Sequence, residues 1–216
     1  MARNRPIYLL SPSKYPDTIY MPMIQFEIIA DKLNLDNCDT LMFTSKQAVK
    51  SAEEIDPGWK RLPSIAIGAA TKKEIESFGG RVLYHPNDYY GSRLAKDIVK
   101  KFASRKILYL RPETISFDSA SFLAEHGIKL QEQIIYRTSC IKYDVESAPA
   151  DNAIIIFTSP SSIYCFLSNF DWKESYIAVV IGESTQEHLP KNANYAVAQT
   201  PMIESCIHKA EELSQQ

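Results

Sequence analysis

The chain contains little glycine and no glycine-rich phosphate loop. Only seven of its 216 residues are glycine. No Gly-x-Gly-x-x-Gly or Walker-type segment occurs, so the fingerprints of dinucleotide and nucleotide binding are missing. The four histidines have no spacing typical of a metal site, and no Gly-x-Ser-x-Gly turn is present to carry a hydrolase serine. We therefore expect a protein that uses neither a metal nor a cofactor.

Cysteine pairs, excess charge and long apolar runs are also missing. The four cysteines are scattered, with no Cys-x-x-Cys pair, which indicates reduced thiols in a cytoplasmic protein rather than a disulfide framework. A net charge of −2 offers no footprint for nucleic acid. The apolar run at 7–10 is too short for a signal peptide, and no run is long enough to span a bilayer. We expect a cytoplasmic protein with neither a nucleic-acid nor a membrane partner.

An internal repeat is the main feature that the sequence does contain. Phe-Thr-Ser at 43–45 recurs at 157–159, and Ile-Gly-x-x-Thr at 67–71 recurs at 181–185. All six identities lie at one constant shift of 114 residues. Motifs duplicated in the same order at the same spacing indicate two related halves.

The hydrophobic pattern of each half predicts alternating strands and helices. Buried strands rich in branched residues lead into each Phe-Thr-Ser, and Ser159 followed by Pro160 is typical of a helix start. Capping-box patterns at 71–74 and 184–187 predict two further helix starts. Strands that alternate with helices form parallel sheets covered on both faces. We therefore expect an α/β protein with two doubly wound, flavodoxin-like parallel-sheet domains.

The second half lacks strands that the first half has, and the amino-terminal segment can supply them. Residues 7–12 resemble residues 107–112, and residues 24–28 resemble residues 132–136. The amino-terminal segment is therefore expected to complete the carboxyl-terminal half.

This arrangement predicts one discontinuous and one inserted domain. The discontinuous domain would contain residues 1–23 and 142–216, and the inserted domain residues 24–141. Two extended segments, near 24–30 and 132–140, would join them, with an interdomain cleft. No long exposed apolar seam is apparent, so a monomer is expected.

Hydroxyl residues stand where an α/β protein binds ligands. Open parallel sheets bind ligands at the carboxyl ends of their strands, and helices that start there offer free N–H groups to anions. The candidate substrate-binding residues at these ends are Thr44, Ser45, Lys46, Thr71, Arg111, Thr158, Ser159, Ser161 and Thr185. The set suits a ligand with several carboxylates or phosphates. Plain helix capping is the alternative role for each hydroxyl residue taken singly.

Tyr136 ends a strand at the expected junction between the domains. One interpretation is a tyrosine that covers the edge of the sheet. The other is a phenol that faces the cleft and donates a proton to a leaving group, although its ordinary pKa is about 10. The aromatic segment 86–91 leaves a similar choice, between a lip of the cleft and an ordinary loop.

In order and spacing, these motifs resemble uroporphyrinogen-III synthases over nearly the whole chain. The matching segments are 43–45, 67–71, 136–138 (Tyr-x-Thr), 157–161 (Phe-Thr-Ser-Pro-Ser) and 181–185. The resemblance implies an enzyme that cyclises hydroxymethylbilane, with loss of water and inversion of ring D, to give uroporphyrinogen III in haem biosynthesis. It implies no cofactor and a partner, hydroxymethylbilane synthase, that hands over the substrate.

The resemblance also implies roles for individual residues. Tyr136 corresponds to the tyrosine proposed to assist loss of the hydroxyl, and Thr71, Ser159 and Thr185 correspond to positions that line the cleft. The family usually has a helix after its first strand, but only nine residues separate Pro12 from Pro22, so we expect none here. The alternative function is a non-catalytic, two-lobed protein that binds a small polyanion.

Overall fold

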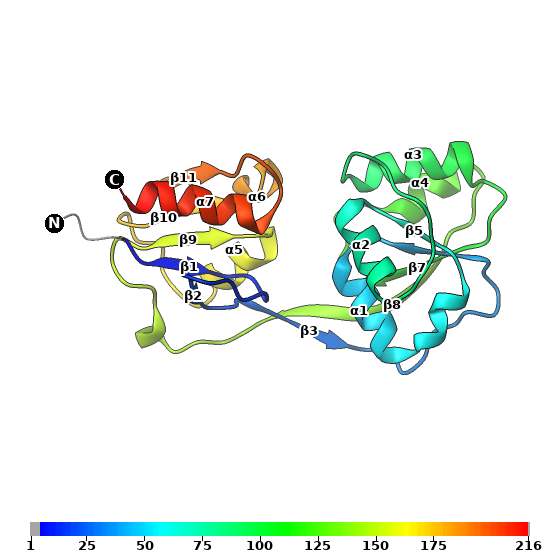
Figure 1. Cartoon of the computed structure of the whole chain (residues 1–216), viewed down its shortest axis with the longest axis horizontal. Helices are drawn as coiled ribbons and strands as arrows, with labels where there is room; N and C mark the ends of the chain where they lie inside the picture. The colour runs from blue at the N-terminus through cyan, green and yellow to red at the C-terminus, as the bar shows by residue number, and fades with distance from the viewer. Residues whose placement is uncertain (1–4, 216) are drawn as a thin grey trace. The chain divides into compact units, whose positions relative to one another are not determined.

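The computed structural model describes residues 5–215, which form two compact units (Figure 1). One unit, here called the discontinuous domain, contains the described residues up to Gln25 and those from Ser139 onward. The other, the inserted domain, is Phe26–Thr138. Each contains a sheet whose strands alternate with helices along the chain, so the predicted α/β class is confirmed.

The discontinuous domain has a five-stranded parallel sheet in the order β11-β10-β9-β1-β2. Its strands are β1 (Ile7–Leu9), β2 (Ile19–Tyr20), β9 (Ile154–Phe157), β10 (Ile177–Val180) and β11 (Asn194–Val197). Its helices are η2 (Val145–Ser147), α5 (Pro160–Leu167), α6 (Glu183–Gln186) and α7 (Ile203–Ser214). Leu9 pairs with Ile156, so the amino-terminal segment completes this half, as predicted. Between Pro12 and Pro22 the chain forms only β2 and no helix, also as expected.

The inserted domain has a six-stranded sheet in the order β3-β8-β7-β4-β5-β6. Its strands are β3 (Ile24–Ile28), β4 (Thr40–Phe43), β5 (Ser64–Ala66), β6 (Val82–Tyr84), β7 (Ile107–Pro112) and β8 (Gln131–Cys140). Its helices are α1 (Lys46–Ile55), η1 (Pro57–Arg61), α2 (Ala69–Ser77), α3 (Gly91–Lys101) and α4 (Ser119–Glu125). The strands from β8 to β6 are parallel. β3 and β8 are the two segments that connect the domains (Figure 1).

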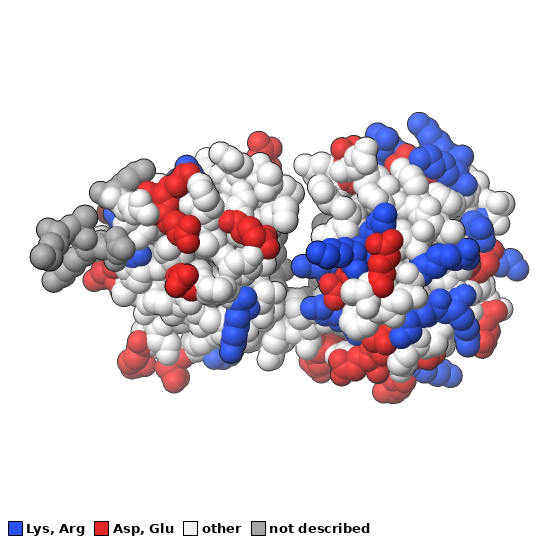
Figure 2. All heavy atoms as spheres, viewed as in Figure 1, with Lys and Arg blue, Asp and Glu red and all other residues white. Residues whose placement is uncertain are grey.

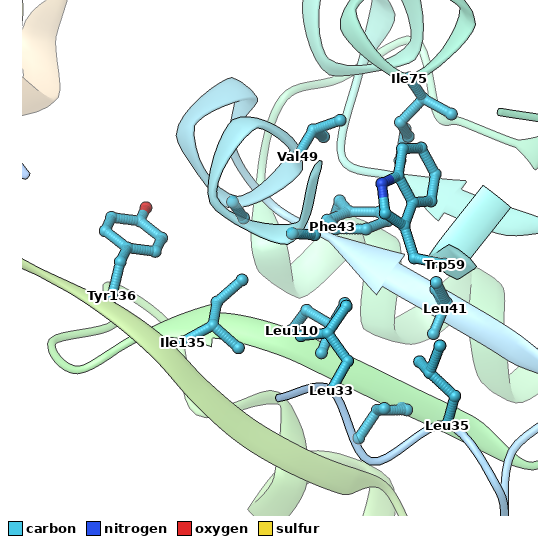
Figure 3. Packing of buried hydrophobic residues seen from close by; sticks show 14 residues of the cluster. Leu33, Leu35, Leu41, Phe43, Val49, Trp59, Ile75, Leu110, Ile135 and Tyr136 are labelled. Carbon is cyan, nitrogen blue, oxygen red and sulfur yellow. The ribbon is translucent and has the colours of Figure 1, made fainter. Parts of the chain in front are cut away.

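Alternate residues of the central strand β4 face two separate cores. Leu41 and Phe43 pack on the side of α1 and η1, where the Phe43 and Trp59 rings meet edge to face at 5.4 Å (Figure 3). Met42 packs on the opposite side with Leu94 of α3. A strand that is buried on both faces explains the uninterrupted apolar run that precedes Thr44. It also fixes Thr44 and Ser45 at the carboxyl edge of the sheet.

Two helices begin earlier than their capping-box patterns predict. α2 follows Gly68 and α6 follows Gly182, and no side chain caps either helix start. The prediction that Thr71 and Ser184 are N-caps is therefore wrong. Each glycine is extended, with φ near 180°, so the helix starts directly after it. Thr71 and Thr185 are instead the third residues of their helices.

The expectation of four reduced cysteines is wrong for one pair. Cys140, the last residue of β8, is bonded to Cys165 of α5, and their Cα atoms are 5.2 Å apart. The two residues are 25 positions apart, and only the folded chain brings them together. Cys38 and Cys206 are free. Among the described helices, none has the length and apolarity needed to cross a membrane.

Candidate functional site

Two tyrosines bind the hydroxyls that follow β4 in the inserted domain. The hydroxyls of Thr44 and Tyr109 share a hydrogen bond of 2.6 Å, and those of Ser45 and Tyr136 share one of 2.9 Å. Tyr109 lies in β7 and Tyr136 in β8. Because β4, β7 and β8 are parallel neighbours, their carboxyl ends meet at one edge of the sheet. The structure thus brings the predicted site residues Thr44, Ser45 and Tyr136 to one edge of the sheet. Tyr109, which the sequence did not single out, lies there with them.

Ser45 has two roles at this edge. Its Oγ accepts the N–H of Ala48 at 3.0 Å and so caps α1, and the same oxygen bonds the phenol of Tyr136. Capping and a role in the site, which the sequence left as alternatives, are therefore compatible in one residue.

Tyr136 is held by packing as well as by Ser45. Its side chain is only 4% exposed, and its ring meets Phe26 edge to face at 5.8 Å. Figure 3 shows the Tyr136 ring at the edge of the apolar cluster that contains Phe43 and Trp59. Its hydroxyl points away from β8, the strand that carries it. Burial raises the pKa of Tyr136, and the hydrogen bond with Ser45 opposes this only in part. The phenol therefore keeps its proton at neutral pH.

Tyr109 is the site residue that sequence reasoning missed. Burial also raises its pKa, while the hydrogen bond with Thr44 lowers it, and the charge that Tyr136 would carry on ionisation raises it further. A tyrosine inside the apolar run 107–110 was the available signal, because a buried phenol needs a hydrogen-bond partner.

The two predicted cations differ in availability. Arg111 Nε lies 3.0 Å from a carboxylate oxygen of Glu132, and its Nη1 donates to the carbonyls of Pro112 and Glu113. The contact with Glu132 is an ion pair without an aligned hydrogen bond, since Nε has no such partner in the described part of the chain. Lys46 is exposed at the first position of α1 and forms no ion pair with any described residue. Lys46 is therefore free to meet an anion, whereas Arg111 is already neutralised.

Two threonine hydroxyls at the equivalent helix starts have no partner. Thr71 is 4% exposed and Thr185 is 1% exposed, and neither makes a side-chain hydrogen bond to any described residue. The hydroxyl oxygens themselves are not enclosed, because the buried side-chain atoms without a partner in the described chain are Ser64 Oγ, Arg111 Nε and Trp172 Nε1. These two groups, beside helix starts that no side chain caps, are suited to donate to an anionic ligand.

In the discontinuous domain the Phe-Thr-Ser motif at 157–159 makes fewer side-chain hydrogen bonds than its copy at 43–45. Ser159 Oγ accepts the N–H of Ser162 at 3.3 Å and caps α5. Thr158 is half-buried, and its hydroxyl makes no hydrogen bond within residues 5–215. Ser161 is exposed in the first turn of α5. The structure therefore places all three predicted residues at the carboxyl end of β9.

Charge is divided unequally between the domains. The inserted domain has 17 Lys and Arg residues against 15 Asp and Glu, a net +2, and the discontinuous domain has 7 against 11, a net −4. Figure 2 shows many basic side chains on one face of the inserted domain and few on the discontinuous domain. Most of the cationic side chains therefore belong to the inserted domain.

The fold and these edges define a class of proteins with two parallel-sheet α/β domains, each with hydroxyl donors at the carboxyl ends of its strands. The profile of the family described as uroporphyrinogen-III synthase HemD matches residues 17–208. The chain therefore belongs to the uroporphyrinogen-III synthase family, whose members are hydro-lyases of tetrapyrrole biosynthesis.

Solved structures show the same fold. The uroporphyrinogen-III synthetase of Helicobacter pylori 26695 is 24% identical, with a TM-score of 0.80, over 97% of this chain and 99% of that one. A mutant uroporphyrinogen III synthase of the extremely thermophilic bacterium Thermus thermophilus is 13% identical, with a TM-score of 0.56, over 90% and 88% of the two chains. At these identities the likeness concerns the fold. No curated protein sequence matches the chain.

Proposed function

We propose that this chain converts hydroxymethylbilane into uroporphyrinogen III, closing the ring with loss of water and inverting ring D. The observation that carries the proposal is the Ser45–Tyr136 pair, with its hydrogen bond of 2.9 Å at the carboxyl edge of the inserted domain. It supplies a fixed, protonated phenol in a protein whose family performs this dehydration.

Tyr136 is the proposed acid. Its O–H donates to the hydroxyl of the substrate as that group leaves, so that the departing oxygen develops as water rather than as hydroxide. A raised pKa keeps the phenol in its acid form, and Ser45 fixes the direction of the ring. Without the hydrogen bond from the Tyr136 phenol, the hydroxyl of the substrate would have to leave as hydroxide.

The other candidate residues position the substrate. We propose that its carboxylates accept hydrogen bonds from Thr71 and Thr185, whose hydroxyls are unpaired, and from Thr158, Ser159 and Ser161 in the discontinuous domain. Lys46 contributes a free charge. Thr44 and Ser45 contact the substrate while the tyrosines hold them in place. Arg111 is omitted, because Glu132 neutralises it. Catalysis of this kind is chiefly orientation of one long flexible reactant.

Product analysis tests the proposal. Freshly generated hydroxymethylbilane is supplied, the products are oxidised, and the uroporphyrin isomers are separated by chromatography. The type III isomer should exceed the control without enzyme, in which closure gives type I. Type I alone from folded protein would contradict the proposal and favour a non-catalytic protein that binds a polyanion.

We further propose that the protein acts as a cytoplasmic monomer that receives its substrate from hydroxymethylbilane synthase. In that reducing compartment the Cys140–Cys165 bond would be open for much of the time. Light scattering of the purified chain should give a mass near 24.5 kDa. A mass near twice that value would contradict the monomer.

A further inference from the structure

The glycine before α2 is required for a steric reason. Gly68 has φ −178°, an extended conformation that any residue adopts, so backbone freedom does not explain it. A Cβ at this position would lie 2.4 Å from Cδ1 of Tyr89 and 2.8 Å from Cε1. The Tyr89 ring therefore lies directly on the backbone of the helix start, and only a hydrogen atom fits between them.

The equivalent glycine of the other domain provides an internal comparison. Gly182 precedes α6 with φ 178°, and a Cβ placed on it would meet nothing within 4 Å. The same backbone geometry therefore occurs without an aromatic cover. The contact at Gly68 is a property of Tyr89 and of the segment that carries it, not of the repeated motif.

The segment that carries Tyr89 is packed at its far end as well. It runs from β6 to α3, and α3 begins at Gly91, where a Cβ would lie 3.0 Å from Cβ of Phe117. The contacts Gly68–Tyr89 and Gly91–Phe117 thus fix the position of the short loop between β6 and α3. Tyr89 itself remains 52% exposed, and its hydroxyl makes no hydrogen bond to any described residue. The side of the ring that carries Cγ, Cδ1 and Cε1 is against Gly68, and much of the side chain is open.

Three groups therefore meet at the start of α2. They are an exposed aromatic ring, helix N–H groups that no side chain caps, and the hydroxyl of Thr71, a residue that is 4% exposed and makes no side-chain hydrogen bond to any described residue. A flat ring fits the aromatic surface, and a carboxylate on that ring fits the N–H groups and the hydroxyl. A pyrrole with an acidic side chain combines both features.

We propose that Tyr89 is a substrate-positioning residue whose ring packs against one pyrrole of the substrate while a carboxylate of that pyrrole binds at the start of α2. The inference rests on the proposed function and adds a residue to it. Tyr89 does not touch the reacting hydroxyl; it restricts how the flexible substrate folds before closure. Its removal should therefore weaken binding and isomer control more than the chemical step.

The test compares Tyr89→Ala, Tyr89→Phe and Tyr90→Ala, with KM, kcat and the ratio of type III to type I product as readouts. Tyr89→Ala should raise KM by about tenfold, from the loss of one aromatic stacking contact, and should lower the share of type III. Tyr89→Phe should stay within about twofold of the unchanged protein, because the phenol has no partner among the described residues. Tyr90→Ala is the matched control: Tyr90 is 70% exposed, and its change should leave all three readouts unaltered.

A second variant tests the contact without altering the tyrosine. Gly68→Ala should displace the ring and raise KM, and its effect should disappear in the Tyr89→Ala background, because there is then no ring to displace. An unaltered KM and isomer ratio in Tyr89→Ala, or an equal loss in Tyr89→Phe, would overturn the inference. Absence of type III product from the unchanged protein would instead overturn the proposed function, so the two failures are distinguishable.

Discussion

The two Phe-Thr-Ser motifs are identical in sequence and differ in what binds them. In both, the serine caps the following helix. In the inserted domain Thr44 and Ser45 are also bonded to phenols, whereas Thr158 and Ser159 bond no phenol of the described chain. The repeat therefore preserves the architecture of the strand end, and the neighbouring strands determine its chemistry.

Strand register identifies the residue responsible for one difference. Tyr109 of β7 pairs with Met42, and Leu9 of β1 pairs with Ile156. Met42 and Ile156 occupy equivalent positions in the repeat, so Leu9 stands where Tyr109 stands. Leucine has no hydroxyl to offer Thr158. The inserted domain thus combines the proposed acid with hydroxyls that are bonded to phenols, whereas the hydroxyl of Thr158 in the discontinuous domain bonds no described residue.

The largest expected effect comes from Tyr136→Phe, which removes only the phenolic hydroxyl. A positioned general acid contributes about 10²–10⁴ in rate, so kcat should fall by tenfold or more while KM changes little. Steady-state kinetics on hydroxymethylbilane measures the loss, and a loss below twofold would remove Tyr136 from the mechanism.

The pH profile provides the matching control. In the proposed mechanism the acid form of the Tyr136 phenol is the active one, and burial raises its pKa above the ordinary 10. Activity that depends on this group should therefore persist to pH 10 and decline only above it. A decline centred below pH 9 that Tyr136→Phe abolishes would contradict a buried, protonated donor.

Opening the disulfide should affect one domain only, because the end of β8 from Ser139 onward belongs to the discontinuous domain, as Cys165 does. The loop between Cys140 and Cys165 spans 25 residues, for which a chain-entropy argument gives about 3 to 4 kcal/mol of stabilisation. Reduction should lower the protection of β9 and β10 amides in hydrogen exchange. Amides of β4 and β5 serve as the internal control and should exchange as before. Equal loss in both domains would show that the bond stabilises the whole chain.

This disulfide also shows where prediction from the sequence stops. The strand-and-helix order and the completion of the second sheet by residues 7–12 followed from local apolar patterns and from the repeat. The Cys140–Cys165 contact, the Tyr109–Thr44 bond and the Arg111–Glu132 pair each join residues on different elements. Their partners depend on register and packing, which a single sequence does not encode in its local pattern. The helix starts at Gly68 and Gly182 were misplaced because a capping-box pattern favoured the threonine and serine that follow.

Replacing the two capping serines one at a time should distinguish helix capping from the hydrogen bond that Ser45 also makes with Tyr136. Ser159→Ala removes a cap and should cost about 1 kcal/mol of unfolding free energy. Ser45→Ala removes a cap and leaves the buried phenol of Tyr136 unpaired, so about 2 kcal/mol is expected. Chemical denaturation measures both values. Equal costs would mean that the Tyr136 hydroxyl finds another partner.

The smallest difference is expected between Thr44→Val and Thr158→Val. Thr44→Val leaves the Tyr109 hydroxyl without its partner inside the protein, at a cost of about 1 kcal/mol. Thr158→Val breaks no internal bond of the described chain, so stability should hold while KM rises by severalfold, since only the ligand loses a donor. Adding Tyr109→Phe to Thr44→Val should recover most of the lost stability, because two apolar groups then replace a hydrogen-bonded pair. If the double variant were less stable than Thr44→Val alone, the Tyr109 hydroxyl would have a second role in the domain, and the comparison of the two motifs would have to include it.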